Sequence, residues 1–237
     1  MLNSILQQQG QLPRLTISVA SLVGDGSPTT KQVCDFFQSQ GLRIKLTEYD
    51  NIEIVGRRGA VRNDQLKLAD SDWVLFTDSD LAYDPLFFHN LASQLSSDLA
   101  NEKLCISASR LSLDIEFCVK YFKELEGSKF SYPCLIPDVA KIVSNWPVNK
   151  AMAKKSGVGR DGRTVSIGAG YFQLANVAHL RDKFGGIYLD PNAKQDPLFG
   201  YHSDRRFRTR LGGIRSIQTL NQYHLNHERG IPLPYQR

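Results

Sequence analysis

Apolar and polar residues follow a regular alternation of strand-like and helix-like spacing over the first 110 residues. Strand-like runs cover residues 15–22, 42–49, 73–76 and 104–109. Helical spacing covers residues 31–40, 60–69 and 85–95, and Val33, Phe36 and Phe37 share one face of the first helix, which Ser27 or Thr29 caps. Strands that alternate with helices predict a parallel sheet with helices on both sides.

The pattern loosens beyond residue 110. It predicts helices over residues 117–125, 176–183 and 202–211, loops over 132–162, and strands near 167–174 and 216–225. We expect one domain over residues 1–237, with a nucleotide-binding half (about 15–110) and an acceptor half (about 111–237). The Gln-rich residues 1–14 are interpreted as a frayed extension before the first strand.

The run Trp73–Phe76 is apolar enough to predict a strand buried on both faces, and it stops at Asp78-Ser79-Asp80. Two carboxylates at the carboxyl end of such a strand lie where open α/β sheets bind ligands. Mg²⁺ or Mn²⁺ held together with a diphosphate would balance their charge. The same tripeptide is also typical of a turn, because Asp and Ser hydrogen-bond their own backbone.

Composition narrows the class of protein only slightly. The 237 residues are 41% hydrophobic and 22% charged, which is ordinary for a globular chain. No apolar run reaches the length of a membrane span, no secretory signal is present, and the four cysteines are scattered, so we expect a cytoplasmic protein without zinc. The net charge of +5 fits an anionic substrate.

Several short motifs follow one another in a defined order. They are Arg62-Asn63, Asp78-Ser79-Asp80, Gly168-Ala169-Gly170-Tyr171-Phe172, Phe184-Gly185-Gly186, Phe199-Gly200-Tyr201-His202-Ser203-Asp204 and Tyr223-His224-Leu225-Asn226-His227. Their order resembles that of the GT-A glycosyltransferases, in particular family 2 and the related galactosyl- and chondroitin-type enzymes. The resemblance spans about residues 15–230 and implies an α/β GT-A fold: a Rossmann-like, mixed, mostly parallel sheet flanked by helices.

The resemblance also implies a metal-dependent, inverting transfer of a sugar from a nucleoside diphosphate sugar, with UDP as the expected nucleotide. Asp80 would bind the metal directly, Asp78 would contact the ribose or the metal, and a late histidine would complete the metal site. His224 fits that position better than His227. The alternative for a single late histidine is a structural role without metal binding. An imidazole ligand favours Mn²⁺ over Mg²⁺.

The nucleotide would be bound by residues that precede or adjoin the two carboxylates. Arg57, Arg58 and Arg62 offer forked donors to the diphosphate or the base, Asp50 would read the base, and Ser79 lies between the carboxylates. The alternative for Arg57 and Arg58 is a solvated helix start, and the alternative for Asp50 is a turn.

Asp204 is the candidate general base. In inverting relatives an acidic pair opens a helix, and its Asp takes the proton of the attacking hydroxyl. Here the pair is Ser203-Asp204, so the Glu is missing, and Asp204 is also well suited to a helix N-cap or first turn.

The acceptor is expected to be a glycan or another hydroxyl compound. The chain lacks the "QxxRW" pattern of processive synthases, so transfer should be non-processive. The basic strip Arg205–Arg215 is either a solvated face or a grip for an anionic acceptor, such as a nucleic acid or a lipid-linked compound. A nucleotidyltransferase and a non-catalytic nucleotide-sugar-binding module are the alternative functions.

Overall fold

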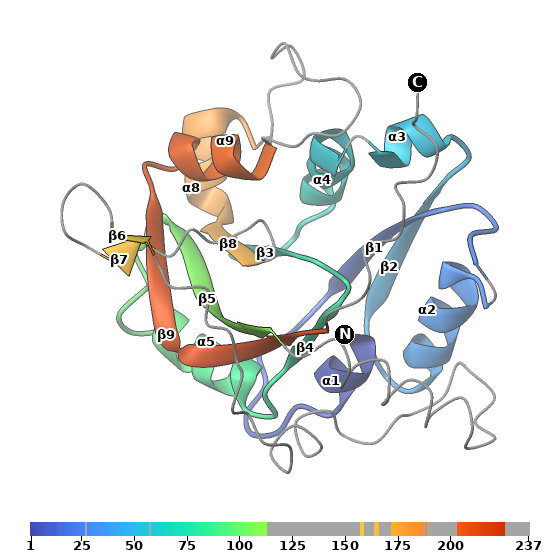
Figure 1. Cartoon of the computed structure of the whole chain (residues 1–237), viewed down its shortest axis with the longest axis horizontal. Coiled ribbons are helices and arrows are strands. Elements are labelled where there is room, and N and C mark those ends of the chain that lie inside the picture. The colour runs from blue at the N-terminus through green and yellow to red at the C-terminus, as the bar shows by residue number, and fades with distance from the viewer. Residues whose placement is uncertain are drawn as a thin grey trace.

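The structure is a computed structural model that describes residues 1–26, 28–56, 58–112, 157–158, 164–165, 172–186, 188 and 203–225. Its largest sheet has the strand order β3-β8-β5-β9-β4. The strands are β3 (Trp73–Thr77), β4 (Leu81–Tyr83), β5 (Cys105–Ser112), β8 (Phe172–Asn176) and β9 (Ile214–His224). Figure 1 shows this sheet beside a second sheet of two strands, with helices around both.

The second sheet pairs β1 (Ile17–Leu22) with β2 (Ile44–Tyr49) in parallel, and α2 (Thr30–Ser39) connects them. Thr29 caps α2 as expected: its hydroxyl accepts from the Gln32 backbone N–H, and the Gln32 side chain accepts from the Thr29 N–H. Phe37 and Cys34 bury the inner face of α2 against Ile44. This βαβ unit confirms the strand–helix–strand order predicted for the start of the chain.

The N-terminus is an ordered helix, α1 (Leu2–Leu6), and its interpretation as a frayed extension is wrong. Ile5 packs in the core of the large sheet, whereas Leu2 and Leu6 pack against the cluster of α2 and β2. The helix therefore packs against the cores of both sheets.

The side chain of Gln8 ties this N-terminal segment to the rest of the fold. Its amide donates to the carbonyl of Asp84 at 2.8 Å and accepts from the N–H of Phe88 at 3.0 Å. Both partners lie near the start of α5 (Phe87–Leu95), so the segment is fixed at a distant part of the chain.

The large sheet is mixed, in agreement with the predicted fold class. β5 and β9 are parallel, while β8 runs antiparallel to both β3 and β5, and β4 runs antiparallel to β9. The parallel pairing expected for residues 73–76 is therefore wrong. Within this strand only Phe76 is buried, because β3 ends the hydrogen-bonded order of the sheet.

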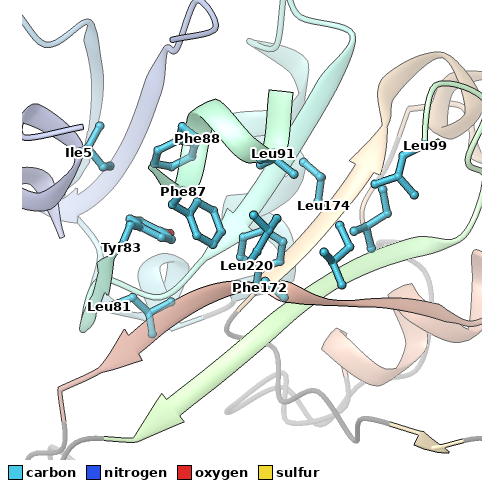
Figure 2. Close-up of a cluster of buried hydrophobic side chains, with 13 residues drawn as sticks. Ile5, Leu81, Tyr83, Phe87, Phe88, Leu91, Leu99, Phe172, Leu174 and Leu220 are labelled. Carbon is cyan, nitrogen blue, oxygen red and sulfur yellow. The ribbon is translucent and has the colours of Figure 1, made fainter. Parts of the chain in front are cut away.

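Two cores cover the two faces of the large sheet, and alternate residues of β8 point to each. Phe172 and Leu174 face a core that includes Tyr83, Phe87 and Leu220 (Figure 2). On the other face, Ala175 packs in a second core with Phe76, Tyr188, Phe207 and Leu180.

The helices of this second face come from both halves of the chain. They are α4 (Arg58–Lys67), α8 (Val177–Phe184) and α9 (Ser203–Arg210), which lie near one another at the top of Figure 1. A short helix, α3 (Ile52–Gly56), precedes α4. Gly185 ends α8 with a left-handed φ of 62°, which glycine adopts without steric cost. The short strands β6 (Gly157–Val158) and β7 (Thr164–Val165) pair with each other in antiparallel fashion.

Candidate active site

Asp78, Ser79 and Asp80 form the connection between β3 and β4. Ser79 is exposed at its tip, and both carboxylates are half-buried beside it. The tripeptide forms a turn, as one interpretation of the sequence expected. It also directly follows a strand of the sheet, which is the position that the metal-binding interpretation requires. The turn is held in place because β4 (Leu81–Tyr83) is fully buried and pairs with β9.

The pairing of β4 with β9 brings Asp80 and His224 together. Leu81 lies opposite His224, and the N–H of Leu225 donates to the carbonyl of Asp80 at 2.9 Å. The Oδ2 atom of Asp80 lies 3.1 Å from Nε2 of His224, and the two side chains are 26% and 15% exposed. Two of the three predicted metal ligands thus lie side by side and remain open to solvent.

Asp78 has a different partner. Its Oδ1 atom lies 4.0 Å from the guanidinium of Arg62, and the Asp78 side chain is 41% exposed. In the part of the chain that the structure describes, no three metal-ligating side chains form one group. The predicted set Asp78, Asp80 and His224 is accordingly divided into an Asp80–His224 pair and an Asp78–Arg62 pair.

Arg62 is buried within a cluster of polar and aromatic side chains. Its Nη1 donates to the hydroxyl of Tyr188 and makes a longer contact of 3.4 Å to Oε1 of Gln173. The guanidinium lies 5.0 Å from the centre of the Tyr188 ring and 5.7 Å from that of Phe76. Tyr188 and Gln173 were not predicted, because neither adjoins the motif residues of α4 or β3 in sequence.

A buried tyrosine and the start of α1 border the same turn. The hydroxyl of Tyr83 lies 2.9 Å from that of Thr77, and burial raises the pKa of this phenol, so it stays neutral beside Asp78. Burial lowers the pKa of the Met1 amino group to about 6, and the carboxylate of Asp80 acts in the opposite direction.

The other predicted nucleotide contacts are exposed or lie outside the described residues. Asp50 follows β2 directly and is exposed, beside the carboxyl end of β1. Arg58 is exposed at the first residue of α4. Arg57 and His227 lie outside the described residues. Among the described residues, Asp50 and Arg58 have no contact that assigns them a role, and the roles of all four residues stay predictions.

Asp204 is the second residue of α9, at the first turn, as the alternative interpretation of this residue expected. The position of its side chain lies outside what the structure describes. The helix itself is firmly placed: the ring of Phe207 stacks on that of Tyr188 with a centroid separation of 4.3 Å and an interplanar angle of 18°. The base role stays a prediction.

Two arginines of the basic strip are engaged within the protein. The guanidinium of Arg210 lies 4.5 Å from the centre of the Phe184 ring, and Arg215 donates to Glu102 at 2.9 Å. Arg206 is exposed. Fewer of the described arginines are therefore available to bind an anionic acceptor, and such binding stays a prediction.

Asp80 and His224 fit a divalent cation by the chemistry of their donor atoms. Carboxylate oxygen and imidazole nitrogen are ligands of Mn²⁺, and a phosphate-bound Mg²⁺ or Mn²⁺ commonly takes only one or two protein ligands and fills its other positions with phosphate oxygens and water. The Asp80–His224 pair, whose Oδ2 and Nε2 atoms lie 3.1 Å apart and whose side chains are partly exposed, meets that requirement.

The comparisons with known proteins agree with this geometry. Residues 1–101 match the family model described as glycosyl transferase family 2. No curated protein shows significant sequence similarity to the chain.

Among solved structures, the chain resembles TarS of S. aureus. The structure of TarS 1–349 in complex with UDP superposes with a TM-score of 0.58 at 16% identity, covering 94% of this chain and 54% of the other. The complex with UDP-GlcNAc gives 0.55 at 14% identity, covering 94% and 53%. The chain thus spans about half the length of that fragment.

The structural matches show that the chain has the GT-A fold, and its first 101 residues are similar to glycosyl transferase family 2. The matched segment covers α1 to α5 and therefore includes Arg62, Asp78 and Asp80. The expected resemblance to the GT-A glycosyltransferases is confirmed at the level of the fold. In the part of the chain that the structure describes, no helix is both long and apolar enough to span a membrane.

Proposed function

We propose that this chain is a glycosyltransferase, and that it moves a sugar from a UDP-sugar to a hydroxyl acceptor in a metal-dependent, inverting and non-processive reaction. The observation that carries the proposal is the Asp80–His224 pair, which lies at the turn after β3 next to the Arg62–Asp78 pair. The Asp80–His224 pair suits a cation, and the Arg62–Asp78 pair suits the ribose and diphosphate of a nucleotide. The UDP and UDP-GlcNAc complexes of TarS, which has a similar fold, support UDP as the nucleotide.

The chemistry follows from where charge develops. The diphosphate leaves with the electrons of the glycosidic bond, and a bound Mn²⁺ or Mg²⁺ would stabilise this charge more in the transition state than in the ground state. Asp80 and His224 would hold that ion, and Arg62 would keep Asp78 oriented toward the donor. Asp204 would accept the proton of the acceptor hydroxyl at the start of α9.

Replacement of Asp80 by Ala tests the metal site. We expect release of UDP from a UDP-sugar in the presence of Mn²⁺ and acceptor to fall by about 100-fold or more, as removal of a group acting on transition-state charge commonly does. EDTA should have the same effect on the unmodified protein. Asp72→Ala is the matched control, because Asp72 is an exposed carboxylate at the opposite end of β3. Full activity in EDTA would refute the metal dependence.

A further inference from the structure

Tyr188 lies where the donor side of the site meets the helix that carries Asp204. Its side chain is fully buried, and its ring stacks on Phe207 of α9. Its backbone N–H donates to Oδ1 of Asn63 at 2.6 Å, one residue after Arg62. The residue therefore contacts both α4 and α9, which come from different halves of the chain.

The hydroxyl of Tyr188 is the centre of a hydrogen-bond triangle. It accepts from Nη1 of Arg62 and donates to Oε1 of Gln173 at 2.6 Å. Gln173 is itself fully buried on β8, so its amide has a fixed position. A phenol that accepts from one group and donates to the other uses both of its hydrogen-bonding capacities, and this fixes its orientation.

This arrangement matters because Arg62 is a buried cation. Its side chain is 10% exposed, and its Nη2 atom lies 4.0 Å from Oδ1 of the partly exposed Asp78, an ion pair that is longer than a hydrogen bond. A buried guanidinium is costly unless its N–H groups are satisfied, and its long side chain loses rotamer freedom when it is fixed. The Tyr188–Gln173 pair supplies both a hydrogen-bond partner and a fixed direction.

We propose that Tyr188, held by Gln173, is a positioning residue for Arg62, and that through Arg62 it orients Asp78 for the nucleotide donor. The inference rests on the proposed function insofar as Asp78 contacts the donor. It assigns Tyr188 no contact with substrate and no part in proton transfer. Loss of its hydroxyl should therefore weaken nucleotide binding and leave the chemical step unchanged.

The test uses Tyr188→Phe, which keeps the ring on Phe207 and removes only the hydroxyl. Loss of one hydrogen bond to a charged group should weaken binding of UDP with Mn²⁺ about tenfold and raise KM for the donor by a similar factor, while kcat stays within about twofold. In an Arg62→Lys background the same substitution should have no further effect, because Tyr188 acts through Arg62. Phe37→Leu is the control for simple destabilisation, since Phe37 lies in the separate core of α2 and β2.

A second measurement is independent of nucleotide binding. In protein labelled with ¹⁵N-arginine, the guanidinium of Arg62, identified by its absence in Arg62→Lys, should show separate Nη signals because its rotation is restricted. These signals should merge in Tyr188→Phe and persist in Phe37→Leu.

The two measurements separate failure of this inference from failure of the proposed function. Unchanged Arg62 signals in Tyr188→Phe, or equal losses of UDP affinity in both backgrounds, would overturn the positioning role. Merged Arg62 signals in a protein that binds no UDP would keep the positioning role and refute the proposed donor.

Discussion

Single residues of the site were predicted with uneven success, for physical reasons. Asp78, Asp80 and Arg62 lie in short local motifs, so their neighbourhood could be inferred from order along the chain. The division of the two carboxylates between His224 and Arg62 could not be inferred, because it depends on the register of β4 with β9 and on the burial of Arg62. Gln173 and Tyr188 closely follow two of the sequence motifs, but their contacts with Arg62 span more than 100 residues, so their role could not be inferred from the sequence.

At the residue scale, Asp204→Asn tests the base role. An Asn keeps the size and the helix-capping ability of Asp but cannot take a proton. We expect sugar transfer to fall by about 100-fold or more, with UDP affinity unchanged. Steady-state rates and calorimetry of UDP binding measure the two quantities, and unchanged transfer would remove Asp204 as the base.

Glu102 gives a prediction for pH dependence. Burial opposes its ionised form, but hydrogen bonds from the Leu104 and Lys103 N–H groups and from Arg215 outweigh burial, so the pKa of Glu102 is lowered from 4.5. A lowered folded-state pKa contributes stability above pH 4.5, and this contribution is lost as the pH falls through the folded-state value.

The variant Glu102→Gln should therefore be less stable than the unmodified protein at neutral pH. The difference should shrink as the pH falls below 4.5, because the native side chain is then protonated as well. Urea unfolding between pH 3 and pH 7 measures it, and a difference independent of pH would contradict the assignment.

At the scale of elements, long amphipathic segments were predicted and short ones were missed. The apolar face and the cap of α2 are local properties, so both were confirmed. β4, which has three residues, was not predicted. α1 was overlooked because the glutamines near it suggested a polar tail. The spacing of Leu2, Ile5 and Leu6 would have indicated an apolar helix face.

The contacts of α1 predict that the N-terminal segment is structural. Gln8→Ala removes hydrogen bonds to the backbone of Ser4, Asp84 and Phe88. The buried N–H of Phe88 thereby loses the hydrogen bond that it donates to the Gln8 side chain. We expect a loss of about 2 kcal/mol in the free energy of unfolding. Gln9→Ala is the control, because Gln9 is exposed and bonds through its backbone. Equal stability of the two variants in urea would contradict this role of α1.

At the scale of the whole molecule, the sequence predicted the fold class through motif order and the βαβ start. It could not predict the strand order, because β8 and β9, from the second half of the chain, each lie between two strands from the first half. That interleaving brings His224 to Asp80 and Tyr188 to Arg62. The site is thus a product of both halves, although the family model covers residues 1–101 alone.

The central claim is that Asp80 and His224 hold a cation together with the diphosphate of a nucleotide. Calorimetric titration of UDP, with and without Mn²⁺, tests it directly in the unmodified protein and in His224→Ala. We predict that Mn²⁺ strengthens UDP binding at least about tenfold in the unmodified protein, and that most of this gain is lost in His224→Ala, as expected when one metal ligand is removed. UDP binding that is equally tight without metal, or an equal Mn²⁺ effect in both proteins, would contradict the claim.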